Sequence, residues 1–297
     1  MISFIYLSPQ SLILIQAPLK YITHTHSLPP PPHYNHHHHH RRQPILHIKN
    51  STSHTGAGAI YYRAGVENGF QKIEGLENVA DVSISDDGNH IWACTDDNAV
   101  YYRPGIEGEW EPQAGRSTRV QVAGNGDHIL FLNTAGNLYY RAGIANGFQH
   151  LEGITDVAHM SMSADGKHIW ATKTDLSVFY SAGPGAEWEE QAGKSKFLHV
   201  GGNGEHLVFV NSAGDVYYRN GIENGFEKLE GASGMSHVSC SAVPPAIPKD
   251  VCFWGCNDDG VVFYKPRKDS DWEEQAGKSK HVHVSGNGSH IMFINSR

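Results

Sequence analysis

A nine-residue segment that combines aromatic, acidic and basic side chains occurs three times in the chain. WEEQAGKSK stands at residues 188–196 and again at 272–280, and the related WEPQAGRST stands at 110–118. The glycine-lysine-serine ending would suit a phosphate-binding loop, but that loop also needs a glycine five residues earlier. Trp188 and Trp272 occupy that position, and Arg116 replaces the lysine in the first copy. We therefore do not expect the segment to bind a nucleotide.

The same segment carries the types of side chain that hold neutral sugars. Such a site uses an aromatic face with a few amide, carboxylate and basic groups, and several equal weak sites on one rigid body raise the avidity. Alternatively, the segment is a solvated outer strand of recently duplicated units, and the sequence identity between its copies reflects their common origin. The candidate ligand-binding residues are Trp110, Glu111, Gln113 and Arg116, then Trp188, Glu189, Gln191 and Lys194, and then Trp272, Glu273, Gln275 and Lys278.

An internal repeat defines the elements that would position these residues. Similar segments that start with an aromatic pair recur at steps of about 40 residues, a period typical of stacked supersecondary units. The last step is lengthened by the proline-rich insertion AVPPAIPKD at residues 242–250. The body of the chain thus holds six units, whose aromatic pairs begin at Tyr61, Tyr101, Tyr139, Phe179, Tyr217 and Phe263.

Each unit is predicted to form four short antiparallel strands. In the second unit, alternating runs at residues 81–85, 90–94 and 99–103 are separated by DDGN and TDDN, and a fourth strand opens at Trp110. Asp-Gly and Asn-Gly pairs between alternating runs are the strongest short hairpin signal, because type I′ turns need positive φ. Repeated four-stranded units of this length predict an all-β fold, a six-bladed β-propeller.

The incomplete units at the two ends predict how the propeller closes. The body begins with only the last two strands of a unit, and residues 281–297 supply only the first two. We expect one blade to combine two N-terminal with two C-terminal strands, which would remove the exposed edges of an open array.

The units alternate in type, so the chain is a two-blade module taken three times. In one type the fourth strand follows Asn-Gly-Phe, at Phe70, Phe148 and Phe226, and in the other it opens at one of the three candidate tryptophans. Tryptophan at a repeated position usually fills the wedge between neighbouring blades. We expect packing roles for the three tryptophans of the second strands, Trp92, Trp170 and Trp254.

Other recurring polar residues give little sign of catalysis or metal binding. The first strands place Gln121, His199 and His283 at positions related by the threefold repeat, which suggests a metal site, but radially standing sheets direct side chains at neighbouring blades. Histidines that open second strands are expected to make structural hydrogen bonds. An active site normally breaks repeat symmetry, and no Ser-His-Asp or Cys-His constellation stands apart from the scaffold. We expect neither an enzyme nor a metal or cofactor site.

Composition separates a tail from the body. Residues 1–55 contain the proline and histidine runs of LPPPPHYNHHHHHRRQP and predict a disordered extension, whereas residues 56–297 carry the propeller repeats. The net charge of −8 argues against nucleic-acid partners, and no apolar stretch is long enough to span a membrane. Residues 2–19 are a poor signal sequence, without a basic start and interrupted by Pro9, which favours a cytoplasmic location over secretion.

The repeat resembles the tectonin repeat. The similarity is carried by VADVSISDDGNHIWACTDDNAVYYRPG at residues 79–105 and by VQVAGNGDHILFLNTAGNLYYRAG at residues 120–143, and it covers the body but not the tail. The sequence departs from the pattern at Phe70, Phe148 and Phe226, where a tryptophan is missing. The resemblance implies a six-bladed propeller, either a lectin for surface glycans, including methylated sugars or bacterial lipopolysaccharide, or a repeat domain that binds proteins.

Two functions therefore remain open at this point. The first is a multivalent, lectin-like protein that recognises surface glycans, with a possible role in innate defence. The second is a non-catalytic platform for protein-protein interactions. Glycan-array binding would favour the first, and capture of a protein partner that survives competing sugars would favour the second.

Overall fold

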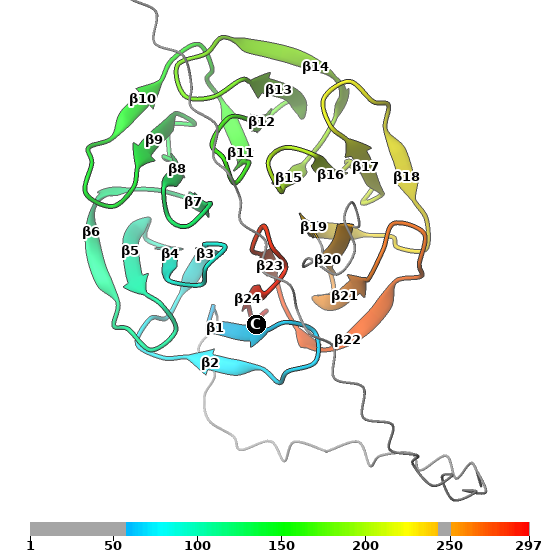
Figure 1. The fold of residues 1–297 in the computed structure, drawn as a ribbon, viewed down its shortest axis with the longest axis horizontal. Coiled ribbons are helices and arrows are strands. Elements are labelled where there is room, and N and C mark those ends of the chain that lie inside the picture. The colour runs from blue at the N-terminus through cyan, green and yellow to red at the C-terminus, as the bar shows by residue number, and fades with distance from the viewer. Residues whose placement is uncertain (1–57, 243–250, 297) are drawn as a thin grey trace, which may run out of the picture. The chain divides into compact units, whose positions relative to one another are not determined.

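Six four-stranded antiparallel sheets stand around a central axis (Figure 1). The computed structural model describes residues 58–296 apart from 243–250, so the predicted tail of residues 1–55 and most of the proline-rich insertion lie outside the described residues. Blade 1 contains β23, β24, β1 and β2 from the axis outward, and blades 2 to 6 follow in chain order as β3–β6, β7–β10, β11–β14, β15–β18 and β19–β22. The strands are β1 (Ile60–Ala64), β2 (Gln71–Ile73), β3 (Val79–Ile84), β4 (His90–Thr95), β5 (Ala99–Pro104), β6 (Glu111–Arg116), β7 (Arg119–Ala123), β8 (His128–Leu132), β9 (Leu138–Ala142), β10 (Gln149–Leu151), β11 (Val157–Met162), β12 (Ile169–Lys173), β13 (Ser177–Ser181), β14 (Trp188–Lys194), β15 (Phe197–Gly201), β16 (His206–Val210), β17 (Val216–Asn220), β18 (Glu227–Leu229), β19 (Met235–Ala242), β20 (Val251–Asn257), β21 (Val261–Lys265), β22 (Glu273–Lys278), β23 (His281–Val284) and β24 (His290–Ile294).

Blade 1 closes the ring as the incomplete end units predict. The N-terminal β1 pairs with the C-terminal β24 from Ile60 opposite Ile294 to Ala64 opposite His290. β2 and β23 complete the sheet on either side. Sheet hydrogen bonds therefore join the two ends of the propeller, and the all-β, six-bladed fold is confirmed.

The histidines that open second strands bond a tyrosine of their own blade, and four of them also contact the next blade. In five blades the histidine Nδ1 is 2.8–3.0 Å from the hydroxyl oxygen of a tyrosine on the third strand. In four of these blades the ring also lies against a turn glycine of the following blade, and a Cβ on Gly126 would stand 2.5 Å from the His90 ring. This glycine also has a φ of 88°, so the Asn-Gly turn is required by backbone conformation and by packing. The expected structural role of these histidines is confirmed.

Two kinds of blade interface alternate around the ring. Trp92, Trp170 and Trp254 are at most 1% exposed, and each packs against the first two strands of the next blade, as predicted. They fill the interfaces between blades 2 and 3, 4 and 5, and 6 and 1. The other three interfaces contain the half-buried outer-strand tryptophans instead, Trp110, Trp188 and Trp272.

A ring of side-chain hydrogen bonds surrounds the axis. Each innermost strand places one polar side chain on the backbone of the next innermost strand. Met162 N–H donates to Gln121 Oε1 at 2.7 Å, and Cys240 N–H donates to His199 Nδ1 at 3.3 Å. Ser83, Ser161 and Ser239 accept from Val122, Val200 and Val284 in the same way. His283 completes the ring through the backbone of Ile84 and Ser83 Oγ.

Ring closure predicts very unequal effects for two truncations. Deletion of residues 284–297 removes β24 and should lower the thermal unfolding midpoint sharply, because β1 and β23 then lose their shared partner. Deletion of residues 1–50 should leave the midpoint nearly unchanged. Differential scanning calorimetry of both variants beside the full chain tests this, and equal effects would contradict the assigned blade boundaries.

Candidate functional site

The repeated segment places its candidate residues on two opposite faces of one outer strand. In β14, Glu189 and Gln191 pair with Tyr180 and Val178, whereas Trp188 pairs with Ser181. Paired residues of a sheet lie on the same side. Tyr180 and Val178 pack toward blade 5, but Trp188 packs into the interface between blades 3 and 4. The tryptophan of each copy is therefore separated from its glutamate and glutamine.

The outer tryptophans have structural partners of their own. The Trp188 indole Nε1 donates to the carbonyl oxygen of Glu152 at 3.1 Å. Arg103 lies over the Trp110 ring with its Cζ 5.6 Å from the ring centroid, and Lys265 Nζ lies 5.7 Å from the Trp272 ring. The tryptophan position thus contributes to the interface between blades in all three copies.

Three further positions of the segment also have structural roles. The glycine has a φ of 94°, 101° and 94° at Gly115, Gly193 and Gly277, and it forms the register shift at the end of the outer strand. The basic residue turns back to its own blade: Arg116 Nη1 donates to Asp97 O at 2.6 Å. Lys278 and Lys194 contact the equivalent turn at Asp259 and Asp175.

The serine that follows is fully buried in each copy and connects one blade to the next. Ser117 Oγ is 2.6 Å from Arg119 O and 2.7 Å from Leu132 O. Ser195 and Ser279 contact the equivalent carbonyl oxygens in blades 5 and 1. The serine of the apparent phosphate-loop ending therefore anchors the connection between blades.

A groove of about 300 Å³ lies where the outer strand of blade 2 meets blade 3. Phe148, which is 44% exposed, and Tyr139 supply its aromatic wall, and Arg116 and Asn133 supply polar groups. Phe148 and Tyr139 were not among the predicted site residues, although the repeated Asn-Gly-Phe and aromatic-pair motifs mark both positions. The complete lining is Val100, Ala114, Gly115, Arg116, Ser117, Phe131, Asn133, Tyr139 and Phe148.

The same nine positions recur with almost no change in the other two modules. Only the basic residue differs, as lysine replaces arginine. Phe70, the counterpart of Phe148 in blade 1, is 40% exposed. Between blades 4 and 5 the positions are Val178, Ala192, Gly193, Lys194, Ser195, Phe209, Asn211, Tyr217 and Phe226, and between blades 6 and 1 they are Val262, Ala276, Gly277, Lys278, Ser279, Phe293, Asn295, Tyr61 and Phe70.

An arginine supports the aromatic wall of each groove from below. Arg141 Cζ lies 5.2 Å from the Phe148 ring centroid and 5.7 Å from the Trp92 ring. Arg63 and Arg219 sit in the same way between a buried tryptophan and an outer phenylalanine. Arg63 Nη1 also donates to Gln275 Oε1 at 3.1 Å across the interface between blades 1 and 6, so the segment's glutamine reaches the neighbouring blade.

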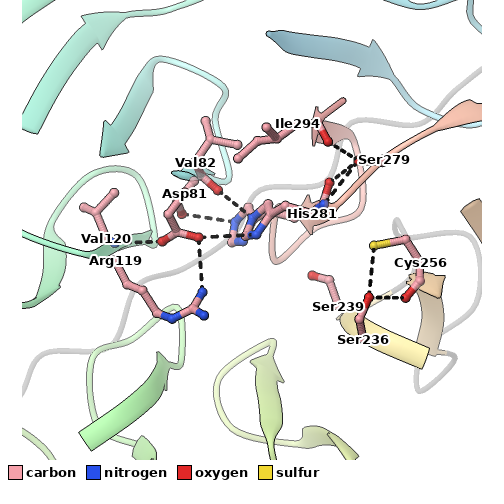
Figure 2. A network of polar contacts seen from close by, with 12 residues as sticks. Asp81, Val82, Arg119, Val120, Ser236, Ser239, Cys256, Ser279, His281 and Ile294 are labelled. Atoms are coloured by element: carbon pink, nitrogen blue, oxygen red, sulfur yellow. Dashed lines mark hydrogen bonds and ion pairs between the residues drawn. The ribbon is translucent and has the colours of Figure 1, made fainter. Parts of the chain in front are cut away.

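A second cluster of ionisable groups joins the innermost strands β3, β7 and β23 (Figure 2). Asp81 Oδ1 lies 3.7 Å from Arg119 Nη1 and 3.3 Å from His281 Nδ1, and Asp81 Oδ2 accepts from Val120 N–H at 2.8 Å. His281 Nε2–H donates to Val82 O at 3.1 Å. Burial raises the pKa of Asp81 to about 6 and lowers the pKa of His281 to about 3. The sequence pattern did not single out this level of the channel.

The threefold-related residues that suggested a metal site are used within the protein. Gln121 and His199 bond the backbone of the next blade, as does His283. Among the described residues, no three His, Cys, Asp or Glu side chains are placed to hold one metal ion. Cys94, Cys240, Cys252 and Cys256 are buried free thiols.

Radial four-stranded sheets, closed in one blade by strands from both ends of the ring, define a β-propeller. The tectonin domain model matches residues 53–242 and 118–297. These segments together cover most of the chain, which therefore belongs to the tectonin family, as the repeat suggested. Comparison with curated protein sequences gives no significant match.

Solved structures share the fold at low sequence identity. YCF48 bound to D1 peptide aligns with a TM-score of 0.50 and 12% identity, over 81% of this chain and 93% of that chain. The Cps50 (Swd1) propeller domain of Myceliophteria thermophila gives 0.50 and 10%, over 76% and 86%. The Niastella koreensis GH74 enzyme gives 0.53 and 9%, over 80% of this chain but only 43% of that chain. Within residues 58–242 and 251–296, no helix is long and apolar enough to cross a bilayer.

The axial cluster predicts an unusual pH dependence of stability. Because the pKa of Asp81 is higher in the folded protein, its contribution to stability is complete below its ordinary pKa and is lost as pH rises through about 6. Asp81→Asn keeps an oxygen for Val120 N–H and cannot ionise. We expect the unfolding free energy of the wild type to fall relative to this variant by roughly 3 kcal/mol between about pH 4 and pH 7.

Urea unfolding followed by circular dichroism across this range measures the difference. His283, whose pKa burial lowers to about 3, loses its contribution as pH falls in both proteins, so it cancels in the comparison. His281 contacts Asp81, and the difference between the two pH profiles therefore belongs to the Asp81–His281 pair. Parallel pH profiles for the two proteins would contradict the assignment.

Proposed function

We propose that the protein is a non-catalytic, multivalent lectin whose three equivalent grooves bind surface glycans. The observation that carries the proposal is the threefold identity of the groove between an outer strand and the next blade. Eight of its nine positions have the same residue in all three modules, and the ninth is always basic. Membership of the tectonin family supports this function, since other members include lectins.

The groove offers the chemistry that a sugar requires. The partly exposed ring of Phe148, with Tyr139 beside it, can stack on the apolar face of a pyranose. Glu111 and Gln113 share the strand face that looks toward this groove and can bond sugar hydroxyls. Arg116 lines the groove while it holds the Asp97 turn, so it is pre-positioned to donate.

Some of the predicted site residues belong to the proposed grooves and others do not. The glutamates, the glutamines and the basic residues, namely Glu111, Glu189, Glu273, Gln113, Gln191, Gln275, Arg116, Lys194 and Lys278, belong to the proposed grooves. The three tryptophans lie on the opposite strand face and support the scaffold next to the neighbouring groove. Glycans, including methylated sugars or bacterial lipopolysaccharide, are the proposed ligands, and innate defence is the proposed setting.

Repetition of the groove also favours binding over catalysis. A catalytic centre needs one nucleophile or one acid-base pair, whereas every ionisable group of the groove occurs three times. Three identical weak sites on one rigid ring raise the avidity for a repeated surface ligand.

Removal of the aromatic walls tests the proposal. The triple variant Phe70→Ala, Phe148→Ala and Phe226→Ala should lose binding on a glycan array that includes methylated and bacterial glycans. Affinity at each groove should fall about fivefold, because stacking on an aromatic ring contributes on the order of 1 kcal/mol. Isothermal titration of the wild type with the best array hit should give three sites per chain.

Matched controls come from the same strands. Glu190→Ala and Glu274→Ala change exposed carboxylates next to Gln191 and Gln275 on the opposite strand face, and they should leave binding unchanged. Absence of binding across the whole array would reject the lectin, and undiminished binding by the triple variant would reject the grooves. Capture of a specific protein that sugars do not displace would favour the interaction platform instead.

A further inference from the structure

The cation above the outer tryptophan is present in two of the three modules. Arg103 covers Trp110, and Lys265 covers Trp272. The equivalent residue in blade 4 is Ser181, the third residue of FYS where the other blades have YYR and FYK. Ser181 pairs directly with Trp188, so it occupies the same register position. Among the described residues, no cation lies over the Trp188 ring.

A pocket of about 310 Å³ is found at this place, between blades 3 and 4. Trp188, Ser181 and Gly185 line one side, and Gln149, His150 and Glu152 line the other. The Ser181 hydroxyl bonds Gly183 O and Ala186 O of its own loop, at 3.0 and 3.2 Å. The small side chain thus leaves open the space that an arginine or lysine fills in the sister modules.

Trp188 is held in a fixed orientation at the pocket. Its indole N–H donates to Glu152 O. In the first module, the equivalent carbonyl oxygen of Glu74 accepts from Arg103 Nη1 at 3.0 Å instead. The indole N–H of Trp188 is therefore already used, and its aromatic ring is what remains for a ligand.

The neighbouring position carries a bridging cation in the third module, where the first module has Ile106. In the third module, Lys268 Nζ bonds Glu227 Oε2 at 2.8 Å across the corresponding groove. Pro184 and Gln149 occupy the equivalent positions in the middle module, so this ion pair cannot form there. The middle groove therefore has neither bridging cation, whereas the first module has one and the third has two, and it keeps the tryptophan and the exposed carboxylate of Glu152.

We propose that the Trp188 pocket binds the cationic head group of a ligand, an alkylammonium or a guanidinium, in the place that Arg103 and Lys265 occupy in the other modules. An aromatic ring attracts a cation placed over its face through its quadrupole, and a neutral group of the same shape lacks this attraction. The pocket lies on the strand face opposite to Gln191 and does not depend on the glycan grooves.

Choline and its neutral isostere 3,3-dimethyl-1-butanol test the proposal on the full chain. The readout is the indole ¹H–¹⁵N signal of Trp188, assigned by its loss in Trp188→Phe. Choline should shift this signal saturably in the millimolar range, and the neutral alcohol should bind at least about fivefold more weakly. Methylguanidinium in a parallel titration distinguishes the two kinds of head group, and sodium chloride controls for ionic strength.

Two reciprocal variants use the difference between the modules. Ser181→Arg supplies the missing cation and should abolish the choline response at Trp188. Arg103→Ser removes the cation from the first module and should create a choline response at the Trp110 indole. The second variant adds no volume, so it remains informative if Ser181→Arg fails to fold.

Several results would overturn the proposal. Equal binding of choline and the neutral alcohol would show an apolar pocket without cation preference. An unchanged choline response in folded Ser181→Arg, or no new response in Arg103→Ser, would show that the residue over the tryptophan does not control the site. None of these results would bear on glycan binding at the three grooves.

Discussion

The free edge of the innermost strands is the constraint on which the rest of the structure depends. Each blade is a separate four-stranded sheet, so its outermost and innermost strands both have a free edge. At the axis, each first strand has backbone N–H groups that find no partner in its own blade. The protein satisfies them with one polar side chain from the preceding blade, as when Gln121 accepts from Met162 and Ser161 accepts from Val200. These bonds follow one another around the axis: Ser239 joins blade 6 to blade 1, and His283 joins blade 1 to blade 2. Ring closure and the register of all six inner strands are therefore linked.

This ring of hydrogen bonds joins the blades at the axis. Farther from the axis, the alternating tryptophans determine which side chains fill the interface between two blades. Where a second-strand tryptophan such as Trp92 fills the inner wedge, an arginine stacks on it and supports an exposed phenylalanine at the rim. Where an outer-strand tryptophan such as Trp110 occupies the interface, polar groups bridge the rim instead, as when Arg103 donates to Glu74 O. The ring thus has two kinds of interface between blades, three of each. The proposed glycan and cation sites belong to different kinds.

Much of the fold could be predicted from sequence because its determinants are local and repeated. Asp-Gly and Asn-Gly turns, the period of the aromatic pairs and the incomplete units at the two ends define the strands, the number of blades and the closing blade. The site could not be predicted in the same way. In β6 the register shifts between Gln113, which pairs with Val100, and Arg116, which pairs with Ala99. This register shift determines the strand face on which each residue lies, and it cannot be predicted from the sequence WEPQAGR. The hydrogen-bond partners of Gln121, His199 and His283 likewise lie in other blades, and they appear only when the ring is closed.

The structure also explains why the three copies of the repeated segment have nearly the same sequence. Tryptophan packs between blades, glycine adopts positive φ, the basic residue contacts a turn and serine bonds two carbonyl groups in each copy. These roles would preserve four positions in a protein that binds nothing. The glutamates at Glu111, Glu189 and Glu273 are exposed and have no comparable hydrogen bond among those described. Burial raises the pKa of the tyrosine opposite each of them, and the negative charge of the glutamate adds to that rise. A scaffold role thus accounts for the tryptophan, glycine, basic and serine positions and, through the bond from Arg63, for Gln275. The three exposed glutamates have no such partner among the described contacts, which is why the proposed ligand site includes them.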